Sequence, residues 1–304
     1  MNGRRMIEMI AYILKALLLI TCFQLTILTH GLAQDDSSRN ERSNLEIYKN
    51  NREFSYVSPN GELGGPTKFV LTGRVTTSYF LLATPKIPVS FALVQDFTVK
   101  VLDQQSAAVR TPSLKLGGVW YVQIGQNATN YRYASLKFMH HSNGQDGQSL
   151  NPDLSINTRD GNFSTNYLVL SYHFGDNVEQ GKQGYTLNHD AGLQWHKWFG
   201  YERVLRNDYG FTRIMYNISF RKQLENRENW RLNASLNYAI NDMADYKATA
   251  VKKRLNTEVS FHYNFPFMHN AYFVAAAGYY GEDTYNIYYR DKYSYLRFGV
   301  STKL

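Results

Sequence analysis

The sequence predicts an all-β fold, a transmembrane antiparallel up-and-down β-barrel of about 12 strands. The chain of 304 residues is rich in aromatic side chains, with 24 Tyr, 17 Phe and 4 Trp. Beyond residue 33, no apolar run approaches the ~20 residues that a membrane helix needs. Successive segments instead alternate apolar and polar residues with the period of two that indicates strands. A soluble β-sandwich shares this alternation, but the N-terminal leader and the number of strands favour the barrel.

Residues 1–33 have the pattern of a secretory signal peptide. Two arginines precede an apolar stretch at 10–28, and Gly31 and Ala33 place small residues at positions −3 and −1 of a cleavage site. A retained N-terminal anchor helix is the alternative, because the apolar stretch is longer than is usual for a signal. The only cysteine is Cys22, so the predicted mature chain has neither disulfides nor cysteine metal sites.

Residues 34–65 are polar and charged, and we expect a flexible periplasmic segment there, with a first strand around 45–57. The barrel is then expected at 66–304. Further strand candidates follow one another in this region, at 67–83, 89–102, 113–125, 130–142, 163–174, 184–199, 208–223, 229–241, 254–265, 269–281 and 286–304. With the early strand they make about twelve, an even number like that of single-chain bacterial barrels.

These candidates separate an apolar face from a polar one. At 229–241, for example, Trp230 and Leu232 alternate with Arg231 and Asn233. In a membrane barrel the apolar face meets lipid and the polar face lines the lumen. The inward residues could fill the lumen with a hydrogen-bonded network or line a pore, and they include Arg231, Asn233, Glu258, His262 and Arg297.

The chain is basic, with a formal net charge of +8. This charge is consistent with an acidic partner such as anionic lipid headgroups. It is equally consistent with basic residues in solvated loops and in a charged lumen. The sequence contains no long run of Lys and Arg of the kind that indicates nucleic-acid binding. With both termini in the periplasm, the strand at 130–142 runs outward, and the longer connections fall on the extracellular side.

The outer end of this strand carries a chemically suggestive motif. Side chains two apart in a strand share a face, so His140 and Ser142 are expected to stand side by side. This is the minimum arrangement for a general base that activates a serine nucleophile. Leu136 shares that face, so the pair continues an apolar stripe, and the substrate of such a hydrolase would be a lipid. The alternative is a pair of polar rim residues without chemistry.

The stretch at 140–144, His-His-Ser-Asn-Gly, resembles the H-x-S-N-G signature of the outer membrane phospholipase A family. The resemblance covers about residues 67–304 and is sharp around 95–110 and 138–172. It implies a calcium-dependent barrel in the outer membrane of a Gram-negative bacterium. It also implies hydrolysis of phospholipids at sn-1 or sn-2 at the extracellular rim, by a homodimer that forms from inactive monomers.

The family's catalytic triad consists of Ser, His and Asn. By resemblance, Ser142 is the nucleophile, His140 is the base, and Asn166 is the residue that orients the imidazole. Asn166 begins the next strand and is expected on the same lipid-facing side. Asn157, in the intervening loop, is the rival for this role. His141 falls on the opposite, lumen face, where we expect a structural part.

The same resemblance implies a calcium ion near the serine, which would stabilise the oxyanion. It assigns the carbonyl of Gln145 and the side chain of Asn162 or Ser149 as ligands, together with Ser106 from the outer loop of a second copy. The family has a serine at the position of Asn162. Carboxylates of the same loop are alternative ligands, namely Asp146 and Asp153.

Gln95 is the polar exception in a run of outward apolar residues. An amide that faces lipid is costly unless it is paired, and the family places a glutamine at its dimer interface. A position at the headgroup level is the alternative for this residue. Two other functions stay open for the whole chain, a lipid A deacylase, whose barrels are smaller, and a non-catalytic porin or adhesin barrel.

Overall fold

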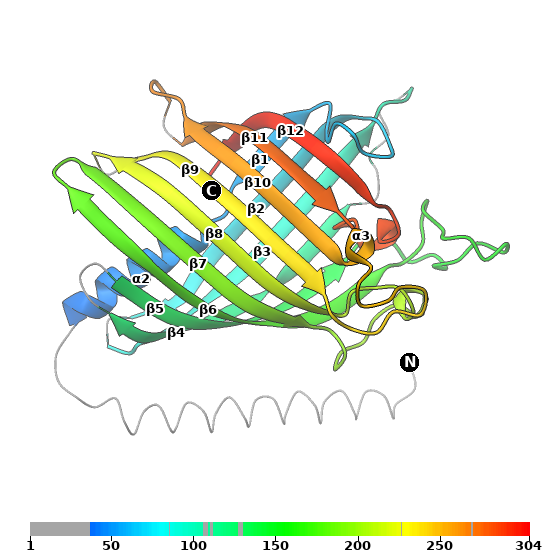
Figure 1. Cartoon of the computed structure of the whole chain (residues 1–304), viewed down its shortest axis with the longest axis horizontal. Coiled ribbons are helices and arrows are strands. Elements are labelled where there is room, and N and C mark those ends of the chain that lie inside the picture. The colour runs from blue at the N-terminus through cyan, green and yellow to red at the C-terminus, as the bar shows by residue number, and fades with distance from the viewer. Residues whose placement is uncertain are drawn as a thin grey trace. The chain divides into compact units, whose positions relative to one another are not determined.

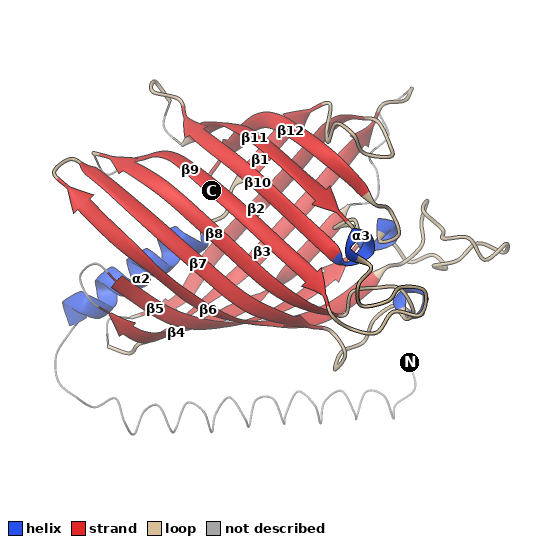
Figure 2. Ribbon diagram, viewed as in Figure 1, coloured by secondary structure: helices blue, strands red, loops and turns tan. Residues whose placement is uncertain are grey.

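The computed structural model describes residues 37–84, 86–105, 109, 112–126, 130–225, 227–268 and 270–304. In the compact unit Asn40–Leu304, twelve antiparallel strands follow one another around a closed barrel, and the last strand pairs with the first (Figures 1 and 2). The predicted fold class is therefore confirmed. The predicted signal peptide at 1–33 and the predicted calcium ligand Ser106 lie outside the described residues.

The strands agree closely with the sequence prediction. They are β1 (Ser55–Pro59), β2 (Phe69–Ala83), β3 (Val89–Leu102), β4 (Ser113–Gln126), β5 (Asn130–Ser142), β6 (Ser164–Gln180), β7 (Gln183–Trp195), β8 (Thr212–Leu224), β9 (Arg227–Ala239), β10 (Leu255–Asn264), β11 (Ala271–Tyr280) and β12 (Tyr293–Thr302). The early strand predicted around 45–57 is wrong in its first half, which belongs to helix α2 (Ser37–Asn51). Because a closed barrel offers no free strand edge, this segment satisfies its backbone groups internally, as a helix.

The two rims of the barrel differ. One consists of short turns, such as that at 181–182. The other consists of longer connections at 60–68, 103–112, 143–163, 196–211, 240–254 and 281–292. These carry the short helices η1 (Arg203–Leu205), α3 (Val251–Arg254) and η2 (Asn286–Tyr288). We call the two ends the turn rim and the loop rim.

Exposure along the strands separates an apolar outer wall from a polar interior. In β10, Val259 and Phe261 are 49% and 39% exposed, whereas Ser260 and His262 are each 5% exposed. A continuous apolar exterior of this kind fits hydrocarbon surroundings better than water. No helix in the described part of the chain is long and apolar enough to cross a membrane.

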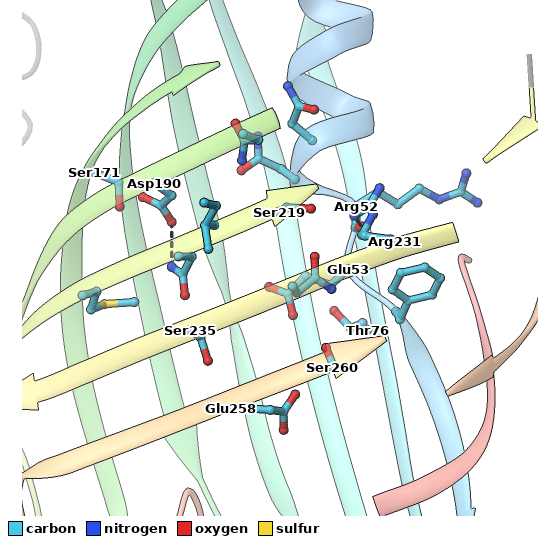
Figure 3. A pocket seen from close by; sticks show the side chains of 18 of the residues that line it. Arg52, Glu53, Thr76, Ser171, Asp190, Ser219, Arg231, Ser235, Glu258 and Ser260 are labelled. Carbon is cyan, nitrogen blue, oxygen red and sulfur yellow. Dashed lines mark hydrogen bonds between the residues drawn. The ribbon is translucent and has the colours of Figure 1, made fainter. Parts of the chain in front are cut away.

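Ion pairs fill much of the interior. Arg297 contacts Glu62 at 3.3 Å and Glu258 at 2.5 Å, and Arg231 contacts Glu228 at 2.7 Å. A cavity of about 390 Å³ remains in the interior, lined by charged, polar and apolar side chains (Figure 3). All the inward residues named from the sequence line it, namely Arg231, Asn233, Glu258, His262 and Arg297. The lumen thus holds a hydrogen-bonded network around a cavity.

Side chains also cover both ends of the interior. At the turn rim, Ile47 of α2 is only 2% exposed and packs in a cluster that includes Tyr131 and Tyr133. Glu46 of the same helix pairs with Arg221 at 2.9 Å. At the loop rim, residues of three loops form a mostly aromatic cluster, Phe163, Leu205, Tyr209, Phe211, Tyr285, Ile287, Tyr288 and Tyr289.

Candidate active site

Strands β5 and β6 bring the predicted catalytic side chains together near the loop rim. In their antiparallel register, His140 lies opposite Asn166, and Ser142 lies opposite Ser164. The Nδ1 atom of His140 is 2.8 Å from the Oδ1 atom of Asn166. His140 is exposed, and Ser142 and Asn166 are half-buried. The sequence alone left open which asparagine meets the histidine, and the strand register places Asn166 there.

A second contact fixes the orientation of the Asn166 amide. Its Nδ2 atom donates to the carbonyl oxygen of Gly200, at 3.0 Å. The Oδ1 atom therefore faces His140, and an amide oxygen can only accept a hydrogen bond. Nδ1 of His140 must then carry the proton, which leaves Nε2 as the basic nitrogen. This is the tautomer that a general base for a serine needs.

Ser142 lies on the same outer wall as His140, two residues further along β5. In the described part of the chain, no residue forms a hydrogen bond with the Ser142 hydroxyl or with Nε2 of His140. Contacts between a nucleophile and its base often tighten only when substrate is bound. Across the next strand pair, Leu114 faces Ser142 and Leu116 faces His140, so the site is bordered by apolar residues.

Asn143, the fourth residue of the motif, closes the neck of the loop at 143–163. Its side chain is buried, donates to the Gly161 carbonyl at 2.8 Å and accepts from the Phe163 amide at 3.0 Å. Gly144 follows with a φ of +65°, a conformation that favours glycine. In the sequence, the Asn-Gly pair was notable only as part of the family resemblance. In the structure, the Asn143 side chain holds the two ends of the loop together.

Residues of the neck and of the loops beside it carry oxygen atoms of the kinds that calcium binds. The backbone amide of Asn162 donates to the Gly147 carbonyl at 3.0 Å. This contact brings Asn162 close in space to the segment that contains Gln145. Ser149 donates through its hydroxyl to the Glu202 carboxylate at 2.9 Å. Carbonyl, amide, hydroxyl and carboxylate oxygens are the ligands that calcium prefers, so this donor set fits the ion in its chemistry.

Glu202 was not singled out from the sequence. It sits in the loop at 196–211, whose residues show no periodic pattern, and only the fold brings it to Ser149. No three His, Cys, Asp or Glu side chains of the described residues gather as a metal site. Of the alternative carboxylates, Asp153 accepts from the backbone and hydroxyl of Ser155 in a turn of the loop.

The remaining predicted residues take clear places. Asn157 bonds within its own loop, to the Gln148 carbonyl at 2.9 Å and to Asp160 at 2.6 Å. His141 is buried on the lumen side, with Nε2 2.8 Å from the Ser113 hydroxyl. These contacts give Asn157 and His141 structural roles away from the outer wall.

Gln95 lies on the outer wall of β3, half-buried. In the strand register it is opposite Leu116, which is itself opposite His140. Gln95, Leu116, His140 and Asn166 therefore form one row across four strands. With ~4.8 Å between strands, the amide lies about 10 Å from the histidine, and the described residues offer it no hydrogen-bond partner.

Comparison with known proteins gives a likeness in structure but none in sequence. No protein-family model matches the sequence, and no curated protein matches it either. Among solved structures, the outer membrane phospholipase A from Escherichia coli is similar, with a TM-score of 0.47 and 12% identity over 82% of this chain and 88% of that chain. The same family was predicted from the motif at 140–144.

Proposed function

We propose that this chain is an outer-membrane phospholipase that hydrolyses the sn-1 or sn-2 acyl ester bonds of phospholipids at the extracellular rim. The observation that carries the proposal is the oriented pair of His140 and Asn166, with Ser142 beside it, on the apolar outside of a closed barrel. A hydrolase with its groups on this wall meets lipid directly. A water-soluble substrate would not reach them in a membrane.

The chemistry follows from the tautomer that the hydrogen bond between His140 and Asn166 sets. Nε2 of His140 takes the proton of Ser142 Oγ as the oxygen attacks the ester carbonyl carbon. The protonated imidazole then gives the proton to the departing glycerol oxygen, and the acyl chain stays on the serine. A water molecule, deprotonated by His140, releases the fatty acid. Asn166 accepts from Nδ1 throughout and stabilises the positive imidazole.

The oxyanion of each tetrahedral intermediate needs stabilisation worth about 3 kcal/mol or more. We propose that a calcium ion supplies this positive charge when it is bound. Gln145, through its carbonyl, and Asn162 would hold it at the loop neck, with Ser106 contributed by a second copy of the chain. Ser149 and Glu202, joined by a hydrogen bond, are further oxygen donors in the same region.

We propose that the active form is a homodimer and that the monomer is inactive. The row that joins Gln95 to His140 supports this arrangement. An interface at Gln95 would pair its amide and would border the catalytic residues two strands away. The second copy could then complete the substrate site and the calcium ligands.

The proposal is tested with purified protein and phospholipid micelles, with calcium or with a chelator. Ser142→Ala and His140→Ala should each lower hydrolysis by roughly 10³-fold or more. Ser164→Ala is the matched control, because this serine lies directly opposite Ser142 on β6 and should keep activity within about threefold. Near-normal hydrolysis by either catalytic variant would overturn the mechanism.

Two alternatives make different predictions. A lipid A deacylase would act on lipid A in preference to phospholipid, and its barrel would be smaller than the twelve strands observed here. A porin-like barrel would conduct ions in a planar bilayer and would not cleave esters. The ion-pair network and the helix α2 inside the barrel argue against an open pore.

A further inference from the structure

The loop between β7 and β8 turns back onto the start of β6. The sequence pattern predicted a strand up to residue 199, but β7 ends at Trp195. Beyond it, Tyr201 forms an antiparallel bridge with Thr165, and the Glu202 amide donates to the Ser164 carbonyl at 3.0 Å. The segment 200–202 therefore lies along one edge of 164–166, while β5 occupies the other edge.

This short added edge carries the Gly200 carbonyl to the Asn166 amide. Two further contacts hold the loop in place. The ring of Phe199 packs edge-on against Phe138 of β5, with 5.3 Å between the ring centroids. Glu202 accepts from Ser149 of the neighbouring loop at 2.9 Å. The loop is thus fastened to β5, to β6 and to the loop at 143–163.

We propose that this loop is a positioning element for the catalytic histidine, with the Gly200 carbonyl as the group that orients Asn166 and Phe199 as the side chain that keeps the carbonyl there. The inference rests on the proposed hydrolase function and deepens it. Without a partner for Nδ2, the Asn166 amide could turn by half a rotation and present its NH₂ group to His140. The imidazole would then carry its proton on Nε2. A protonated Nε2 cannot accept the proton of the Ser142 hydroxyl.

The test is a double-mutant cycle on the full chain. Phe199→Ala should lower kcat by about tenfold and leave KM within about twofold, because displacement of a catalytic group by about an ångström costs up to ~100-fold. Asn166→Ala should lower kcat by roughly 100-fold, the lower end of what a positioned general base contributes. If Phe199 acts through Asn166, then Phe199→Ala should have no effect in the Asn166→Ala background.

The matched control is Trp198→Ala. Trp198 is the adjacent residue of the loop, is 70% exposed and contacts Trp195 rather than Phe138. It should keep kcat within about twofold. Heat-modifiable migration in electrophoresis checks that every variant forms the barrel, and hydrogen exchange of the Glu202 amide reports whether Phe199→Ala loosens the loop.

The outcomes separate the two claims. Loss of activity in Ser142→Ala together with additive effects of Phe199→Ala and Asn166→Ala would overturn the positioning role and leave the hydrolase intact. A Phe199→Ala variant with a loosened Glu202 amide and normal kcat would do the same. Normal activity in Ser142→Ala would overturn both claims. A non-additive cycle beside an inactive Ser142→Ala supports both.

Discussion

The positioning loop should open in acid because of a buried histidine at its base. His196 has no exposed surface, and its ring contacts those of Tyr167, Tyr209 and Phe211. Burial, together with the positive charge of the nearby Arg213, lowers the pKa of His196 well below its usual value of 6.5. The closed loop therefore keeps this imidazole neutral, while an opened loop lets it bind a proton.

The sign and size of the effect follow from linkage. The pKa of His196 is lower in the closed loop than in the opened loop. The resulting stabilisation of the closed loop is therefore present above pH 6.5 and is lost as the pH falls below that value. At about 1.4 kcal/mol per pH unit, lowering the pH from 7.5 to 5.0 should cost the closed loop up to about 2 kcal/mol. This corresponds to a rise of about 30-fold in the opened fraction.

Amide hydrogen exchange measures this opening directly. The reporters are amides of the loop itself, Phe199, which donates to the His196 carbonyl at 3.1 Å, and Glu202, which donates to Ser164. After correction for the intrinsic pH dependence of exchange, their protection should fall by about 30-fold between pH 7.5 and 5.0. The Glu225 amide, bonded to Lys182 at the turn rim, should show no such change.

The variant His196→Phe keeps an aromatic ring in the cluster and removes the titration. Its loop amides should therefore lose the pH dependence and keep their protection at pH 5.0. Equal pH dependence in the wild-type protein and in His196→Phe would refute the reasoning, and so would protection that increases toward acid.

Three further predictions concern the triad, the interface and the lumen. Asn157→Ala should keep hydrolysis within about twofold of wild type, in contrast to the loss of roughly 100-fold in Asn166→Ala, and equal losses in a micelle assay would contradict the assignment of Asn166. Gln95→Ala should lower the yield of crosslinked dimer in detergent with calcium, and an unchanged yield would argue against an interface at this residue. Ile47→Ala should remove about 3 kcal/mol of packing from α2 and speed tryptic cleavage within the helix by about 100-fold. Leu45→Ala, at a position 50% exposed, is the control and should cleave at the wild-type rate.

The chain's sequence determined the barrel and the face on which His140 and Ser142 lie. The period of two in segments such as β10 reflects lipid on one side and a polar lumen on the other, so it can be read without coordinates. The same alternation places His140 and Ser142 on one face, because residues two apart in a strand cannot face different sides. The strand expected around 45–57 is wrong in its first half, which belongs to α2 and packs Ile47 into an interior cluster.

Only the tertiary structure decided what surrounds the pair. The choice between Asn166 and Asn157 depends on the register of β5 with β6, which no short stretch of sequence specifies. The contacts of Gly200 and Glu202 depend on the loop that follows β7. This strand ends four residues earlier than the sequence pattern predicts, and the loop then folds back onto β6. Periodicity reports which face a strand residue takes, whereas backbone carbonyls and loop ends acquire their partners only when distant segments meet.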